Sequence, residues 1–246
     1  MFDPVELILT ALAVLITLAI HEYAHAFVAY KLGDDTAKSF GRLTLNPLKH
    51  LDPIGALCML FFRVGWAKPV PINARNFKNP KRDFAISAMA GPLINLILAF
   101  VFSGIYIFTW YGFISLLPLD IGEIEFNVAN NLLMFLNIFF SVNVGLGIFN
   151  LLPIPPFDGS RLLNVIFPPR IYFGIMKYER QIYFGVLGWL LLGDYAAMAV
   201  RSLPFIASSP ILYTVAGILS LSDMLSVAIG FIAGLMLDFW LLFIPL

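Results

Sequence analysis

The sequence predicts an all-α polytopic membrane protein with five or six transmembrane helices and a small membrane-associated β-hairpin or sheet in the first cytoplasmic loop. Three observations predict this fold. The 246 residues are 60% hydrophobic and only 12% charged, whereas roughly 25% of the residues in a soluble domain are charged. The apolar residues gather in stretches long enough to cross about 30 Å of hydrocarbon. Most of the charged residues lie between these stretches, which places them in loops.

Four candidate spans and a long apolar tail follow one another along the chain. A span needs about 20 apolar residues, and the segments that reach this length are 6–30, 84–111, 129–152 and 182–203. The tail, residues 211–244, is too long for one upright span. It is either one long tilted helix or a short membrane-entering piece, broken near Ser220–Asp223, that precedes a full span.

The basic residues predict how the chain is oriented. Of the fifteen Lys and Arg residues, ten lie between Lys31 and Arg82 and four between Arg161 and Arg180, whereas segment 112–127 has none. Because cytoplasmic loops carry an excess of Lys and Arg, we expect both basic regions on the cytoplasmic side and 112–127 outside, together with the N-terminus. This topology predicts a multi-pass protein of the cell membrane (plasma or inner membrane).

The loop between the first two spans, residues 31–83, predicts the small sheet. "FGRLTLN" (40–46) alternates apolar and polar residues as a strand does, and "ALCMLFF" (56–62) is a short apolar run. "AKPVPIN" (67–73) has prolines that suit an edge strand. We expect these segments to form a hairpin or sheet against the cytoplasmic face of the bilayer.

The stretch "HEYAH" (21–25) places three ionisable side chains inside the first span. His21 and His25 are four residues apart, so on a helix their imidazoles lie on one face, one turn apart. Neutral imidazole is a good zinc ligand, and the adjacent Glu22 can act as a general base on water. Two structural histidines, hydrogen-bonded to their neighbours, are the alternative, but polar groups within a span usually mark a function. His21 would lie about 14 Å below the cytoplasmic helix end, at roughly 1.5 Å per residue, and so within the membrane.

A catalytic zinc ion has three protein ligands and a water molecule, so one more ligand is needed. A third histidine six residues after His25 is absent, because that position is Lys31. The next glutamate along the chain, Glu123, belongs to the external loop, and His50 belongs to the basic loop, where we expect it to be solvated. Cys58 is the only cysteine, which excludes a cysteine cluster.

Asp158 is the aspartate best placed to be the third ligand. It follows the third span in "NLLPIPPFDG" (150–159), where three prolines must end the helix and Gly159 permits a sharp turn. Irregular backbone at membrane depth is tolerated where it is buried in protein or lines a cavity. A capping aspartate in a simple proline-rich turn is the alternative reading of the same residues.

Three motifs together resemble a known family. "HEYAH" (21–25), "AGPLINL" (90–96) and "NLLPIPPFDG" (150–159) occur in the order found in the site-2 proteases, which are intramembrane zinc metalloproteases. "GWAKPVPIN" (65–73) is similar to the short prokaryotic members, which lack PDZ and CBS domains. The resemblance covers about residues 6–165 and implies a single membrane-embedded protease domain over residues 1–246, with further transmembrane helices at about 182–246.

The resemblance implies a role for each candidate site residue. His21, His25 and Asp158 would bind one Zn²⁺ ion per chain, and Glu22 would be the catalytic base. Asn95 and Asn150 would contact the substrate or the oxyanion; for both, a hydrogen bond between helices is the alternative. Gly91 and Pro92 are expected to allow close helix approach rather than to take part in chemistry.

The implied function is hydrolysis of peptide bonds within or next to transmembrane segments of membrane proteins. The expected partners are transmembrane protein substrates and the lipid bilayer, with no nucleic acid; a homo-oligomer is left open. An edge strand within 40–73 could hold the substrate extended by strand addition. The alternative function is a non-hydrolytic membrane metal-binding protein or transporter, which would need ligands continuing across the bilayer.

Overall fold

Long apolar helices dominate the computed structural model, which describes residues 3–53, 55, 67–116 and 122–244. The chain divides into two units, Met1–Gly147 with Gly234–Leu246, and Ile148–Ala233. The division falls within two continuous helices, α6 (Glu123–Asn150) and α12 (Leu221–Leu241).

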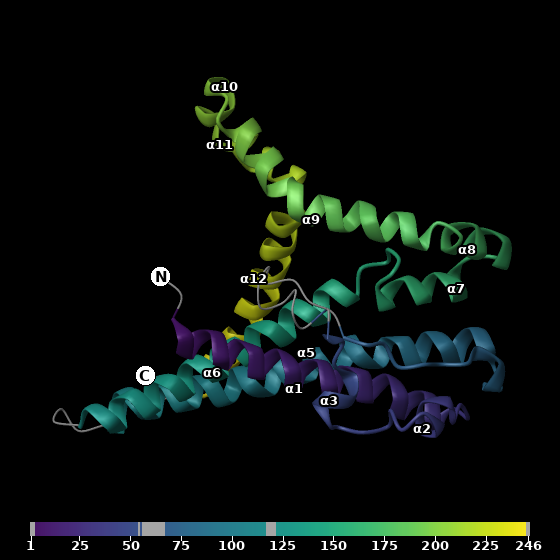
Figure 1. The fold of residues 1–246 in the computed structure, drawn as a ribbon. Helices are drawn as coiled ribbons and strands as arrows, with labels where there is room; N and C mark the ends of the chain where they lie inside the picture. Colours follow the sequence, from purple (N-terminus) through teal and green to yellow (C-terminus); the bar gives the residue numbers. More distant parts are fainter. Residues whose placement is uncertain (1–2, 54, 56–66, 117–121, 245–246) are drawn as a thin grey trace. The chain divides into compact units, whose positions relative to one another are not determined.

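The first unit is built around α1 (Pro4–Lys31) and α5 (Pro80–Leu116), which lie side by side (Figure 1). Asp3 caps α1 by accepting a hydrogen bond from the Val5 backbone N–H at 2.8 Å, which satisfies one of the free donors at the helix start. The fully buried residues of α1 are small, and small residues let helices approach closely; these residues are Ala13, Thr17, Ala26 and Ala29.

Helices α6 and α12 add contacts to this pair within the first unit. Asn143 of α6 donates a hydrogen bond to Thr17 Oγ1 of α1 at 2.9 Å. Trp240, in the last part of α12, donates to the Phe100 carbonyl of α5 at 2.9 Å. Gly104 of α5 makes room for the Trp240 ring, because an added Cβ would lie 2.7 Å from it. A few polar contacts and one close approach therefore tie apolar helices together.

The expected sheet in the first loop is wrong for the residues that the structure describes. Two short helices, α2 (Thr36–Ser39) and α3 (Pro47–His50), flank residues 40–46, and the only pairing described nearby is one isolated bridge between Leu51 and Ala67. Residues 56–62 lie outside the described residues.

Turn chemistry explains why these segments are not strands. Gly41 has a φ of +64°, a left-handed conformation that interrupts a strand. Asn46 caps α3 by accepting from the Leu48 backbone N–H at 3.0 Å, so the alternating run ends in a helix start. Pro69 and Pro71 lack the N–H donors that a ladder needs, which leaves 67–73 without a regular strand partner among the described residues.

The second unit consists of shorter helices and one bent long helix. After α6 come the two short helical turns η2 (Asp158–Leu162) and α7 (Leu163–Ile166), then α8 (Pro169–Met176) and α9 (Glu179–Arg201). The remaining elements are short: α10 (Pro204–Ala207), α11 (Pro210–Ala216) and η3 (Gly217–Leu219).

The tail is broken at Ser220, between η3 and α12. The expectation of a short apolar piece followed by a full span is therefore confirmed, and one long helix is excluded. Four helices are long and apolar enough to span a membrane, and α9, which bends by 44°, would be the fifth if it counts as one span. The described residues contain no sixth span. The predicted number of five spans is therefore reached only if the bent helix α9 is counted, and six is not reached.

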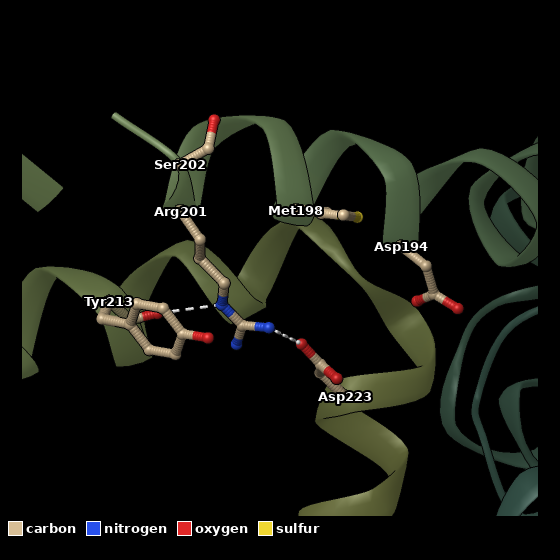
Figure 2. Close-up of a pocket in the computed structure, with 6 residues that line it drawn as sticks. All are labelled: Asp194, Met198, Arg201, Ser202, Tyr213 and Asp223. Atoms are coloured by element: carbon tan, nitrogen blue, oxygen red, sulfur yellow. Dashed lines mark hydrogen bonds and ion pairs between the residues drawn. The ribbon is translucent and has the colours of Figure 1, made fainter. Parts of the chain in front are cut away.

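Polar side chains join α9 to the broken tail in the second unit. Ser220 and Ser222 both donate hydrogen bonds to Asp194 of α9. Arg201 pairs with Asp223 at 2.7 Å and donates to the Tyr213 carbonyl at 3.2 Å. Figure 2 shows Arg201 reaching toward both partners at the edge of a cavity of about 330 Å³. We call the residues Asp194, Arg201, Tyr213, Ser220, Ser222 and Asp223 the aspartate cluster.

Candidate metal centre

Helix α1 presents His21 and His25 on one face, as the four-residue spacing predicts. Both side chains are buried, and their exposed fractions are 5% and 6%. Their Nε2 atoms lie 3.0 Å apart, with the ring centroids at 4.6 Å. Two imidazole nitrogens therefore converge on one point inside an apolar helix pair, an arrangement that suits a metal ion.

The backbone of α5 fixes the orientation of His25. Its Nδ1 atom lies 2.8 Å from the Ser87 carbonyl oxygen. A carbonyl can only accept, so Nδ1 carries the proton, and in the neutral ring Nε2 is the nitrogen that has the lone pair. Such a second hydrogen bond is typical of a histidine that ligates a metal through its other nitrogen.

Asn95 of α5 contacts the other histidine. Its Nδ2 atom lies 3.1 Å from His21 Nδ1, and the side chain is fully buried. Its Oδ1 atom is also buried and has no hydrogen-bond partner among the described residues. We call His21, His25 and Asn95 the histidine cluster.

Gly91 faces the two imidazoles from α5. A Cβ atom at this position would lie 2.6 Å from both Cε1 and Nε2 of His21, and closer still to Nε2 of His25. Any side chain would therefore displace the ring nitrogens. Close helix approach was expected here from the sequence, but the structure adds that the space Gly91 leaves is the space in which the nitrogens meet.

Glu22 lies beside the two histidines in sequence and is held by the first loop. The Val70 backbone N–H donates to Glu22 Oε2 at 2.8 Å. The segment 67–73 thus lies against the carboxylate that would act as a base. Arg42 donates to the carbonyl oxygen of Lys68 in the same segment.

Asp34, three residues beyond α1, fastens the other end of this segment. It is fully buried and accepts hydrogen bonds from the Asn73 backbone N–H and from Asn76 Nδ2, both at 2.7 Å. Burial alone would raise the pKa of Asp34, but the hydrogen bonds from Thr36, Asn73 and Asn76 outweigh it and lower the pKa below its usual value. The ionised carboxylate therefore anchors the loop to the end of α1.

Asp158 and Asn150 belong to the second unit. Asn150 is the last residue of α6, and Asp158 is the first residue of the short helix η2. Gly159, the next residue, packs on the turn before it, because an added Cβ would lie 2.7 Å from the Leu152 carbonyl oxygen and closer to that of Leu151. The predicted sharp turn is therefore present, while the roles predicted for Asp158 and Asn150 stay predictions.

His50 is buried rather than solvated. Its exposed fraction is 2%, and its Nε2 lies 2.8 Å from the Thr44 carbonyl oxygen. The expectation of a solvated side chain is wrong because the loop folds back on itself, with Lys68 N–H donating to the His50 carbonyl at 2.9 Å. His50 is a structural histidine of the loop.

Comparison with known proteins identifies the family. The model of Peptidase family M50 matches residues 9–177, more than half of the chain. The chain belongs to peptidase family M50. It is 42% identical over 188 residues to YwhC of Bacillus subtilis, covering 75% of this chain and 81% of YwhC. It is 33% identical over 165 residues to MJ0611 of Methanocaldococcus jannaschii, covering 66% and 73%.

This chain matches a smaller share of a third relative. Rip2 of Mycolicibacterium smegmatis is 31% identical over 154 residues, or 61% of this chain and 54% of Rip2. All three relatives are named as candidate zinc metalloproteases. No solved structure matches the chain. The resemblance to the site-2 proteases is thus confirmed, and the chain is a multi-span membrane metalloprotease of family M50.

The M50 family implies zinc, and the residues present fit it. The histidine cluster supplies two nitrogen donors, a fixed second hydrogen bond at His25 and an unpartnered amide oxygen at Asn95. Sequence reasoning found both histidines but missed the contacts from α5. The spacing of Ser87, Gly91 and Asn95, four residues apart on one helix face, is the signal that could have found them.

Proposed function

We propose that this M50 protease is an intramembrane zinc endopeptidase, which hydrolyses peptide bonds within or next to transmembrane segments of membrane proteins. The observation that carries the proposal is the convergence of His21 Nε2 and His25 Nε2, 3.0 Å apart, within a helix apolar enough to span a membrane. Buried imidazoles in such a helix cost free energy, so their presence usually marks a functional site.

Asp158 is our proposed third ligand, so that each chain binds one zinc ion through two nitrogens and one carboxylate oxygen. These three residues each offer one ligand atom of a kind that zinc accepts. When bound, zinc would supply a Lewis acid that activates water and polarises the scissile carbonyl.

Glu22 acts as the general base in this proposal. Its carboxylate takes a proton from the attacking water and returns it to the leaving amine nitrogen. The Val70 N–H, which donates to Oε2 at 2.8 Å, holds the carboxylate in one orientation and leaves its other oxygen for the proton. Such positioning lowers the entropic cost of the reaction.

The substrate is a transmembrane helix that must unwind before attack, because a helix shields its scissile carbonyl with backbone hydrogen bonds. We propose that the segment Ala67–Asn73 holds the unwound chain by strand addition. The segment contacts Glu22 through the Val70 N–H, which supports this role. Asn150 would contact the substrate or the oxyanion.

The proposed orientation follows the distribution of basic residues. The loops 31–82 and 153–181 hold fourteen of the fifteen Lys and Arg residues and are therefore cytoplasmic in the proposal. The N-terminus is then external, and the site faces the cytoplasmic half of a cell (plasma or inner) membrane.

The decisive experiment combines cleavage with metal binding. The purified full chain, reconstituted in liposomes, is incubated with candidate transmembrane substrates before and after zinc chelation, alongside Glu22→Gln. We expect chelation to abolish cleavage and Glu22→Gln to abolish cleavage while it retains zinc. Undiminished cleavage by Glu22→Gln would refute the base assignment. Zinc binding without cleavage of any transmembrane substrate would favour the non-hydrolytic alternative.

A further inference from the structure

Asn95 has a polar atom that the hydrogen bonds of the structure leave unused. The side chain is fully buried, its Nδ2 lies 3.1 Å from His21 Nδ1, and its Oδ1 has no partner among the described residues. A buried acceptor without a partner destabilises the folded state, so it calls for an explanation.

The hydrogen bonds of the histidine cluster form a chain with one direction. His25 donates from Nδ1 to Ser87, so in the neutral pair its Nε2 would accept the proton of His21 Nε2 across 3.0 Å. His21 Nδ1 is then bare and accepts from Asn95 Nδ2. In this chain the proton of His21 is on Nε2, the nitrogen that faces His25, and that nitrogen cannot bind a metal ion.

Zinc binding through His21 Nε2 requires the opposite tautomer. The proton must then be on Nδ1, where it needs an acceptor. A half-turn of the Asn95 carboxamide exchanges its oxygen and nitrogen without altering its shape. The half-turn brings Oδ1 to Nδ1, where it can accept the proton, and moves Nδ2 to the place that Oδ1 occupies in the structure.

We propose that Asn95 is a positioning residue that selects the metal-binding tautomer of His21 by accepting the Nδ1 proton through Oδ1. The inference deepens the proposed function and rests on its zinc site. The two histidines differ in this respect. His25 faces a backbone carbonyl, which can only accept, whereas His21 faces a carboxamide, which can donate or accept and so permits both tautomers.

Zinc affinity of three variants tests the proposal, measured on the purified full chain by competition with a chelator. Asn95→Asp keeps the acceptor and, when ionised, has no N–H; Asn95→Leu keeps the approximate volume and removes both groups. Ser103→Ala is the matched control, because Ser103 is also fully buried on α5 and donates to Phe100. We expect Asn95→Asp to bind zinc at least as tightly as the unmodified chain, and Asn95→Leu to bind roughly 10- to 100-fold more weakly. Ser103→Ala should match the unmodified chain.

A second measurement reads the tautomer itself. The chain has three histidines, so ¹⁵N spectra of the histidine-labelled, zinc-loaded protein can be assigned with His21→Ala. We expect a protonated Nδ1 and a metal-bound Nε2 at His21. Coordination through Nδ1 would overturn the proposal.

The affinities separate the failure of this inference from that of the zinc site. If the unmodified chain does not bind zinc, the proposed function falls, and this inference with it. If the unmodified chain and Asn95→Leu bind zinc equally, the inference alone falls. If Asn95→Leu does not fold, Asn95→Asp decides, since binding more than tenfold weaker than that of the unmodified chain would show that the donor is what His21 needs.

Discussion

The histidine cluster and the aspartate cluster both place polar groups among apolar helices, yet they differ in how these groups are matched. In the aspartate cluster, Asp194 receives two hydroxyl donors, and Arg201 pairs with Asp223 and the Tyr213 carbonyl. Its charged groups satisfy one another. In the histidine cluster, the Asn95 oxygen has no partner among the described residues, and Gly91 leaves space at the ring nitrogens.

This difference indicates that the aspartate cluster has a structural role, whereas the histidine cluster is suited to bind a ligand. A set of charges that pair with one another and with nearby hydroxyl groups can join α9 to the broken tail without any ligand. Two imidazole nitrogens that converge in a buried position, by contrast, form an arrangement that suits a bound metal ion. The cavity beside Arg201 (Figure 2) is therefore less informative than the close approach of the two imidazoles to Gly91.

The sharpest test of the comparison is Gly91→Ala. A methyl group 2.6 Å from the His21 ring atoms must push the imidazoles or α5 aside. A misplacement of about 1 Å can cost roughly 100-fold in rate, so we expect at least that loss in cleavage and a comparable loss in zinc affinity. Both are measured on the reconstituted chain.

Gly112→Ala is the matched control for Gly91→Ala. Gly112 is on the same helix, and an added Cβ there would have nothing within 4 Å among the described residues. We expect its zinc affinity to be unchanged. If both variants bind zinc equally well, the space at Gly91 has no role in the site.

Gly159→Ala tests the second unit in the same way. Its Cβ would collide with the backbone oxygens of Leu151 and Leu152, which cannot move as a side chain end can. The turn that carries Asp158 must therefore shift, and we expect zinc affinity to fall roughly 10- to 100-fold, as for loss of a supporting contact. Gly174→Ala, in α8 with open space, should bind zinc normally; equal binding by both would remove Asp158 from the proposed ligand set.

Local periodicity made the histidine pair predictable. The spacing of His21 and His25 fixes a shared face on any helix, and the apolar residues around them fix the span. Their partners on α5 were not predictable from α1, because Ser87, Gly91 and Asn95 meet the imidazoles only through packing between helices. The resemblance pointed to Asn95, but its contact with His21 needed the structure.

The first loop shows where the sequence pattern misled. The alternation at 40–46 is that of a strand, but Gly41 and the capping Asn46 turn the chain instead. Local turn chemistry outweighed periodicity there. In the tail, by contrast, a break near Ser220 was one of two predicted outcomes. The structure has this break, and the Ser220 hydroxyl there donates to Asp194.

Asp34→Asn tests whether the loop is anchored by a charge. The asparagine would present an N–H group to at least one of the donors at Asn73 and Asn76, and loss of hydrogen bonds to a charged group costs roughly 1.5–3 kcal/mol. We expect residues 67–76 to exchange backbone hydrogens faster, while the helices are unaffected. Hydrogen exchange followed by mass spectrometry measures this directly.

The same anchor predicts a dependence on pH. Because the pKa of Asp34 is lower in the folded loop than its ordinary value of 3.8, its contribution is complete above about pH 4 and is lost as the pH falls through the folded value. After correction for the intrinsic exchange rate, which itself falls with pH, the protection of 67–76 should therefore decrease in acid in the unmodified chain and change little in Asp34→Asn. An identical acid response in both would assign the anchor to another group.

The smallest expected effect is that of breaking the aspartate cluster. Arg201 and Asp223 are both partly exposed, with side-chain exposed fractions of 24% and 41%, and an exposed ion pair contributes about 0–1 kcal/mol. Arg201→Gln and Asp223→Asn should each lower the unfolding temperature slightly, and the double variant should lose less than the sum, since the two single changes remove the same pair. Zinc affinity should not change in any of them. A loss of zinc affinity here would mean that the matched charges of the second unit support the metal centre, and the distinction between a structural and a chemical cluster would then fail.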